Sequence, residues 1–321
     1  MRFFDMPLWE TRVFIAIFGL LWGSFLNVVI YRLPLGMSVV RPPSHCPACE
    51  TPIRAWQNVP FFGWIFLGGK AACCKVKIPV RYPLVELLGG IAAVAVLEMQ
   101  RASHPELSLG VGIAVFLANY FLVLGLIAGV FIDLEHMILP NEITMGGAVL
   151  AMATTTLRGQ SFTDAAIGAV TGFLIIYVPM VLYKWIRGRE GLGWGDAKLL
   201  VLVGAWVGIE GVMFTLFAGA VQGTLFALVT MLVMGKIEEP ESVKQQRAEL
   251  QALADAGDEE AREELEGDPV GQEPADGFMR APIAFGPMLI LGAFEYFFFG
   301  KVLVKACMDF LDATIGSVFG F

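Results

Sequence analysis

Long apolar stretches alternate with short polar ones along most of the 321-residue chain. A helix needs about 20 apolar residues to cross roughly 30 Å of hydrocarbon, and three of the stretches reach that length only with their polar flanks. The pattern predicts an all-α polytopic membrane protein with about eight transmembrane helices. The predicted spans are residues 11–30, 83–99, 109–132, 144–157, 166–186, 197–209, 211–234 and 282–299.

One region departs from this pattern. Residues 31–82 contain four of the five cysteines and no apolar run of span length. We expect them to form a small cysteine-rich domain after a first transmembrane helix at 1–30. Residues 83–235 and 281–321 form the predicted helical bundle, and residues 236–280 form a loop between two of its spans.

Composition supports the membrane class and gives an orientation. The chain is 56% hydrophobic and 16% charged, with a mean hydropathy of +0.68, which is far from the composition of a soluble domain. Of the 22 Lys and Arg residues, 16 fall in the predicted loops on one side of the bilayer. The side richer in Lys and Arg is cytoplasmic, so the cysteine-rich domain and the loop 236–280 are predicted to be cytoplasmic.

The net charge of −8 comes from that loop. Residues 236–280 carry 14 acidic and five basic residues, with few large apolar side chains. This composition predicts a solvated short helix in a flexible connection. Docking of a partner protein is the alternative. Membrane lipid is the expected surrounding of the bundle, and no nucleic-acid partner is expected.

The cysteines of the cytoplasmic domain stand in two pairs, Cys46 with Cys49 and Cys73 with Cys74. Disulfides are disfavoured in the cytoplasm, and paired cysteines in a domain with little apolar core indicate a tetrahedral structural zinc site. The second pair is irregular, because a C-x-x-C motif would need a cysteine at Ala71. Three thiolates with His45 or water, and thiols without metal, are the alternatives.

Two aspartates stand at the cytoplasmic ends of predicted spans. Asp133 lies in "GVFIDLEHMILPNEIT" and Asp196 in "GLGWGDAKLL", with 62 residues between them. The topology places both on the cytoplasmic face, and charged groups at membrane depth are costly and usually functional. Two neighbouring carboxylates share a proton, so that one can deprotonate a water while the other protonates a leaving group. This predicts aspartic-protease chemistry.

The residues beside the aspartates have two interpretations each. Gly193 and Gly195 are predicted to keep the backbone near Asp196 non-helical and available to an extended substrate; alternatively, Asp196 is the N-cap of the following helix. Glu135 and Glu190 are interfacial residues, or they support the binding of a basic leader peptide.

Glycines four residues apart recur in the predicted spans. This spacing lets helix backbones approach closely in lipid, so helix packing is predicted, with a groove for a substrate helix as the alternative. The pairs are Gly125 with Gly129, Gly168 with Gly172, Gly204 with Gly208 and Gly219 with Gly223.

Five blocks of sequence, taken in order, resemble the type IV prepilin leader peptidases, and the resemblance extends over nearly the whole chain. It implies a bifunctional bacterial inner-membrane enzyme of the GxGD aspartic type. Such enzymes cleave the basic leader from prepilins and type II secretion pseudopilins at the cytoplasmic face, and then methylate the new N-terminus with S-adenosylmethionine. The blocks are "GSFLNVVIYRLP" (23–34), "HCPACETPI" (45–53), "IDLEHMILPNEIT" (132–144), "GLGWGDAKLL" (191–200) and "FGPMLILG" (285–292).

The resemblance implies that Asp133 and Asp196 are the catalytic residues and that residues 31–82 hold the zinc. Ala71 departs from the family pattern, and the acidic loop is longer than the family usually has. Methylation rests on the resemblance alone, because no glycine-rich nucleotide-binding loop is visible. Gly23 and Asn27 are candidates for a cofactor site, with helix packing as the alternative.

Three other functions compete with this one. The first is a peptidase without methyltransferase activity. The second is a cation- or proton-coupled transporter that uses the same aspartates, although both lie at the membrane edge rather than at its midplane. The third is a structural assembly factor, which leaves the paired aspartates unexplained.

Overall fold

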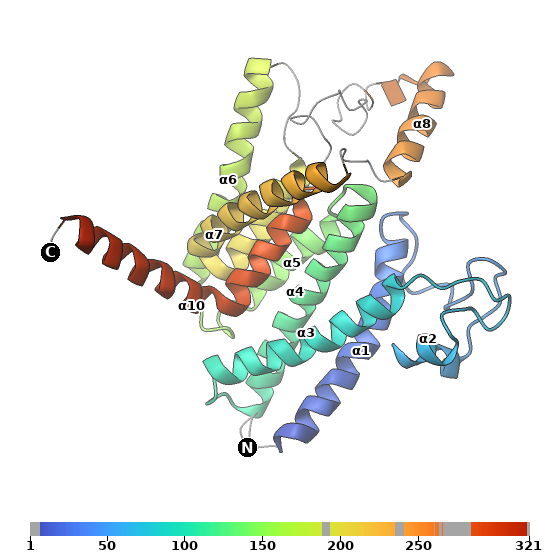
Figure 1. The fold of residues 1–321 in the computed structure, drawn as a ribbon, viewed down its shortest axis with the longest axis horizontal. Helices are drawn as coiled ribbons and strands as arrows, with labels where there is room; N and C mark the ends of the chain where they lie inside the picture. The colour runs from blue at the N-terminus through green and yellow to red at the C-terminus, as the bar shows by residue number, and fades with distance from the viewer. Residues whose placement is uncertain are drawn as a thin grey trace. The chain divides into compact units, whose positions relative to one another are not determined.

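The computed structural model is helical. It describes residues 7–187, 193–234, 241–259, 261–262, 265 and 284–319. Within these ranges the regular elements are all helices (Figure 1), and strand pairing is limited to two isolated β-bridges. The predicted all-α class is therefore confirmed.

The helices follow the predicted apolar stretches. Among the described residues, α1, α3, α4, α6 and α7 are long and apolar enough to cross a bilayer. In chain order the elements are α1 (Leu8–Arg32), η1 (Ala55–Asn58), α2 (Phe62–Phe66), α3 (Arg81–Ser103), α4 (Leu109–His136), α5 (Asn141–Ala153), α6 (Phe162–Arg187), α7 (Trp194–Met234), α8 (Glu241–Asp255) and α10 (Gly286–Phe319).

Several elements differ in their bounds from the expected spans. The predicted spans 197–209 and 211–234 are parts of the single element α7, which is broken at Gly208, where φ is 76°. Helix α5 has only 13 residues. Helix α10 continues to Phe319, although its apolar part is Gly286–Gly300. A run of apolar residues predicts where a helix lies better than where it ends.

The chain divides into two compact units, Met1–Ile132 and Asp133–Phe321. In the first unit, α1 and α3 pack along each other (Figure 1). A Cβ on Gly23 would lie 2.7 Å from the Glu86 carbonyl oxygen, and a Cβ on Gly89 would lie 2.7 Å from the Gly19 carbonyl oxygen. The fully buried Tyr120 of α4 has its hydroxyl 3.2 Å from the carbonyl oxygens of both Gly19 and Gly89. Gly23 therefore serves helix packing.

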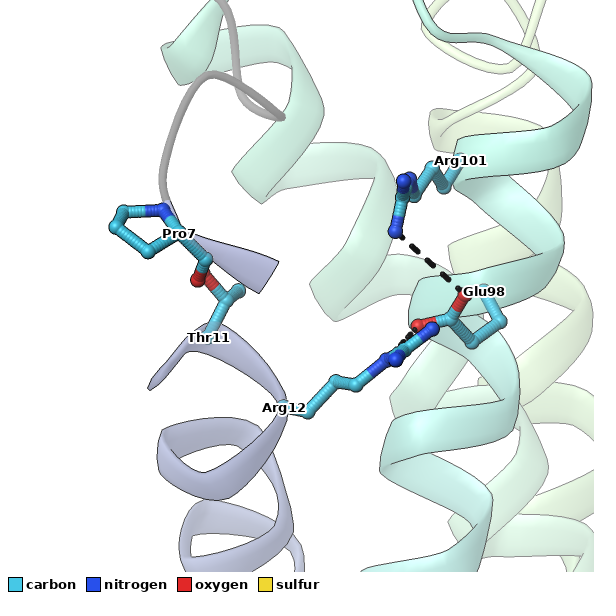
Figure 2. A network of polar contacts seen from close by, with 5 residues as sticks. All are labelled: Pro7, Thr11, Arg12, Glu98 and Arg101. Carbon is cyan, nitrogen blue, oxygen red and sulfur yellow. Dashed lines mark hydrogen bonds and ion pairs between the residues drawn. The ribbon is translucent and has the colours of Figure 1, made fainter. Parts of the chain in front are cut away.

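An ion pair joins the first turns of α1 to the last turns of α3. Arg12 Nε lies 2.7 Å from Glu98 Oε1, and Arg101 Nη1 lies 3.9 Å from Glu98 Oε2 (Figure 2). The Thr11 hydroxyl donates a hydrogen bond to the Pro7 carbonyl at 3.0 Å. Exposed ion pairs add little stability, so the packing of α1 against α3 depends mainly on the glycine contacts described above.

Helix α7 is central to the second unit, where it contacts α5, α6 and α10. It meets α6 through glycines: a Cβ on Gly168 would collide with the Gly204 carbonyl oxygen, and a Cβ on Gly172 would collide with that of Leu200. Gly219 similarly faces Leu289 of α10. These glycines therefore act in helix packing, as their spacing predicts.

Substitution of Gly168 tests this packing. We expect Gly168→Leu to destabilise the second unit by on the order of 3 kcal/mol, because the added side chain must push two helix backbones apart. Unfolding in mixed detergent micelles, followed by circular dichroism, measures the change. Gly146→Leu in α5 is the control, since a Cβ there meets nothing within 4 Å. Equal stability of the two variants would contradict this account.

The connection between α5 and α6 is fixed by Arg158. Its guanidinium donates hydrogen bonds to the carbonyl oxygens of Trp206 at 2.7 Å and Ala151 at 2.9 Å, and it lies 4.3 Å from the centre of the Trp206 ring. Burial lowers the pKa of Arg158 to about 10, so it remains charged at neutral pH. A cation thus satisfies carbonyls at the end of α5 and just before the break at Gly208.

Candidate active site

Asp133 lies in the last turn of α4. Its side chain is buried, with the residue 6% exposed. The helix ends at His136, and Met137, with φ of 55°, donates its N–H to the Asp133 carbonyl oxygen at 2.9 Å. This is a left-handed C-terminal cap. It stops the helix one turn after Asp133 and keeps the carboxylate at the helix end.

The first residue of α10 contacts Asp133. The N–H of Gly286 donates a hydrogen bond to the Asp133 carboxylate. A Cβ on Gly286 would lie 2.5 Å from Asp133 Oδ2, so only glycine allows this approach without a shift. The positive end of the α10 dipole faces the carboxylate. A role for Gly286 does not follow from the sequence pattern, although "GP" before an apolar run is a signal for a helix start.

Asp196 lies in the first turn of α7, which begins at Trp194. The residue immediately before the helix is therefore Gly193, not Asp196. Gly195 lies inside the helix rather than in non-helical backbone. The predicted start of this span, residue 197, is three residues too late. Asp196 is thus an acidic residue at a helix N-terminus, where negative charge is favourable.

The structure brings the two aspartates together. Asp196 is close enough to Asp133 for their charges to interact. Leu139 packs beside both: a Cβ on Gly195 would lie 3.3 Å from Leu139 Cβ, and a Cβ on Gly286 would lie 3.0 Å from Leu139 Cδ1. The end of α4 and the starts of α7 and α10 therefore converge on one site.

Of the four other predicted site residues, the structure describes three. Glu135 is half-buried in the last turn of α4 and interacts with another group, and Gly193 is exposed. Glu190 lies outside the described residues. Lys198 Nζ donates a hydrogen bond to Asn141 Oδ1 at 2.8 Å, which joins the first turns of α7 and α5. The arrangement suits acid–base chemistry by two carboxylates, with Asp133 facing the start of α10 and Asp196 in the first turn of α7.

The four cysteines lie in two turns of the same shape, at residues 45–52 and 70–77. Each turn is closed by an isolated β-bridge, and each has one residue in the left-handed region, Glu50 with φ of 57° and Lys75 with φ of 61°. In each turn the second residue donates its N–H to the carbonyl five residues later, at 3.0 Å and 2.8 Å. The second turn therefore repeats the backbone of the first.

This repeat explains the irregular cysteine spacing. In the matched register Ala71 takes the position of Cys46, and Cys73 takes that of Ala48. The thiol that Ala71 lacks is supplied by Cys73, two positions later in the same turn.

All four Sγ atoms lie within 4.8 Å of one another. A tetrahedral site with Zn–S bonds of about 2.3 Å has sulfur atoms about 3.8 Å apart, so the cluster has suitable dimensions. Among the described residues this cluster consists of the four cysteines, and His45 is not part of it. The Sγ separations are 3.3 Å for Cys49 and Cys73, 3.6 Å for Cys46 and Cys74, and 3.9 Å for Cys73 and Cys74.

The thiols perturb one another. Hydrogen bonding to Thr51 lowers the pKa of Cys49 to about 6, which favours the thiolate that binds metal. Hydrogen bonding to Cys49 raises the pKa of Cys73 to about 12. A cluster that disfavours a second negative charge in this way is stabilised by a cation.

Comparison with known proteins gives one consistent result. The model of the bacterial peptidase A24 N-terminal domain matches residues 17–99, and that of the type IV leader peptidase family matches residues 120–228. Relatives named prepilin leader peptidase/N-methyltransferase include those of Stutzerimonas stutzeri, 36% identical over 69% of this chain and 81% of the relative, and Dichelobacter nodosus, 37% identical over 70% and 84%. The Neisseria gonorrhoeae relative is 33% identical over 69% and 82%. No solved structure matches the chain.

Proposed function

This chain belongs to the prepilin leader peptidase/N-methyltransferase family, and from that premise we propose that it is a membrane aspartic endopeptidase. Its substrates are type IV prepilins and type II secretion pseudopilins, whose basic leader it removes at the cytoplasmic face. It then methylates the new N-terminal residue with S-adenosylmethionine. The observation that carries the peptidase activity is the proximity of Asp133 and Asp196.

The two aspartates divide the acid and base roles. One carboxylate takes a proton from the water that attacks the scissile carbonyl carbon. The other gives its proton to the amide nitrogen as the C–N bond breaks. The N–H of Gly286 holds the Asp133 carboxylate in place for this exchange. Gly193 and Gly195 support the backbone of the site, and Glu135 and Glu190 attract the basic leader.

We propose that the four cysteines hold a structural zinc ion. The Sγ separations support four-thiolate coordination, with Cys73 in place of a thiol at position 71. The ion would join the two turns, 45–52 and 70–77, which have little apolar core of their own. His45 is not needed as a ligand.

We also propose a bacterial inner-membrane location with eight membrane segments. These are the helices α1, α3, α4, α5, α6 and α10 and the two parts of α7 on either side of Gly208. In this topology the cysteine turns, Asp133 and Asp196 are on the cytoplasmic side, where the excess of Lys and Arg lies.

Incubation of the purified chain in detergent with a prepilin and methyl-labelled S-adenosylmethionine tests the function. We expect a shortened pilin that carries the label on its N-terminal residue, detected by mass spectrometry. The Stutzerimonas stutzeri relative serves as the positive control on the same prepilin. Failure of this chain where the relative succeeds would refute the peptidase, and cleavage without label would leave a peptidase alone.

The contact between Gly286 and Asp133 gives a second test. We expect Gly286→Ala to lower the cleavage rate about 100-fold, because the methyl group displaces the Asp133 carboxylate and small misplacements are costly. Initial rates of prepilin cleavage measure the effect. Gly223→Ala in α7 is the control, since its Cβ would meet atoms only at 3.5 Å or more. Equal rates for both variants would show that Gly286 does not position the site.

A further inference from the structure

The first unit has a partly open cavity of about 680 Å³ that includes neither aspartate. It lies between the end of α1, the cysteine turns and the start of α3. Its volume is within the range of roughly 300–1,000 Å³ found for small-molecule sites. The cavity is therefore large enough for a nucleoside-sized ligand, and the peptidase chemistry does not use it.

Asn27 presents an unpaired acceptor in this cavity. The residue is 4% exposed, and its Nδ2 donates a hydrogen bond to the Tyr82 carbonyl oxygen at 3.0 Å. That bond fixes which end of the amide is which. Asn27 Oδ1 is buried and has no hydrogen-bond partner among the described residues. A buried acceptor without a partner is unfavourable, so a ligand donor that reaches Oδ1 through a small movement of the cavity wall would remove the penalty.

Glu86 adds a negative charge to the same cavity. Its Oε2 accepts a hydrogen bond from the Phe61 N–H at 2.6 Å, and its carboxylate also accepts one from the Ser24 hydroxyl. Both of these partners are neutral, so they orient the carboxylate without cancelling its charge. A carboxylate in a partly enclosed site attracts a cationic ligand.

The remaining wall groups extend this chemistry. Trp64 is fixed by a hydrogen bond from its Nε1 to the Ile78 carbonyl oxygen at 3.1 Å, and its ring offers a surface for a flat base or a cation. Arg32 is 6% exposed and is held by a hydrogen bond from Nη1 to the Ser38 carbonyl oxygen. A buried guanidinium suits a carboxylate ligand.

We propose that this cavity binds S-adenosylmethionine, with Asn27, Arg32 and Glu86 as its polar anchors. The ligand class follows from the groups present: an anion for a sulfonium or ammonium centre, a guanidinium for a carboxylate, and an aromatic wall with a free acceptor for an adenine. The inference rests on the methyltransferase activity proposed above.

When bound, this cofactor supplies an electrophilic methyl group: the N–C bond forms as the C–S bond breaks, sulfur keeps the electron pair, and the amine releases one proton. The residues of the chain bind and orient it. Glu86 and Asn27 are therefore binding residues rather than acid–base groups, and their loss should act on affinity.

Equilibrium binding of labelled S-adenosylmethionine to the full chain in detergent tests the assignment. We expect Glu86→Gln and Asn27→Leu each to weaken binding at least about tenfold, since each removes one polar anchor of a desolvated ligand. Glu98→Gln is the matched control: it makes the same change on the same helix, α3, outside the cavity, and we expect it to bind as the wild type does. Unchanged binding by both cavity variants would overturn the assignment.

Photocrosslinking of the labelled cofactor to the wild-type chain avoids any dependence on how the variants fold. We expect the label on peptides within residues 24–86, and label only on peptides from the second unit would overturn the proposal.

Prepilin cleavage by the same preparations distinguishes a failure of the cofactor assignment from a failure of the proposed peptidase activity. A wild-type chain that binds the cofactor in residues 24–86 but does not cleave refutes the peptidase alone. One that cleaves but does not bind the cofactor refutes this inference and the methyltransferase activity together. Binding with label outside the cavity refutes this inference only.

Discussion

We expect Asp133→Asn and Asp196→Asn each to lower prepilin cleavage by about 10²–10⁴-fold, the usual contribution of a general acid or base. Asparagine keeps the shape of the side chain but cannot exchange a proton at neutral pH. Either substitution therefore leaves a site that can bind substrate and cannot complete the proton transfers. Cleavage of a purified prepilin by wild type and variants at equal protein concentration measures the loss.

Asp164→Asn is the matched control for this experiment. Asp164 is also an aspartate near a helix end, in the first turn of α6, but it is exposed. We expect full cleavage from this variant. Methyl transfer to an already cleaved pilin peptide should persist in both aspartate variants, because the proposed cofactor cavity contains neither residue. Full cleavage by either Asp133→Asn or Asp196→Asn would show that the pair is not the catalytic dyad.

Loss of the metal is expected to have the second large effect. We predict about one equivalent of zinc in the purified chain, and its loss in Cys73→Ala, with unfolding of residues 45–77, because metal binding supplies the folding energy of such small domains. The double variant Cys73→Ala with Ala71→Cys should regain zinc. The repeated turns place position 71 where the first turn has Cys46, so a thiol there can bind the ion.

Elemental analysis and protease resistance of the 45–77 segment measure these changes. Cys307→Ser is the control, since it removes a thiol that belongs to neither cysteine turn in the sequence. Less than about half an equivalent of zinc in the wild type would refute the metal site. Zinc in the wild type without recovery in the double variant would refute only the register of the second turn.

The apolar pattern predicted the membrane helices well because hydrocarbon imposes both length and composition on each span. It also predicted two spans, 197–209 and 211–234, where the structure has the two parts of α7. The break between them lies at Gly208, where φ is 76°, two residues before the predicted boundary at 210. A single left-handed residue leaves no polar stretch in the sequence, so hydropathy does not distinguish a break from a loop.

Some residues of the site could be predicted from the sequence and others could not. Topology was sufficient to predict that Asp133 and Asp196 lie near each other, because Asp133 stands at the end of one predicted span and Asp196 just before another on the same predicted side. It was insufficient for Gly286, whose contact with Asp133 depends on the packing of α10 rather than on its position along the chain. The sequence also showed that Ala71 interrupts the cysteine motif, but the shift of the thiol to Cys73 requires the repeated backbone of the two turns.

The short helices of the second unit bear on the supply of water to the reaction. Helix α5 has 13 residues and the part of α7 before Gly208 spans 194–207, so each is about 20 Å long, against roughly 30 Å for a hydrocarbon core. Such hydrophobic mismatch is expected to thin the adjoining bilayer. A thinned leaflet brings bulk water to the ends of these helices, where a hydrolase embedded in lipid must obtain its second substrate.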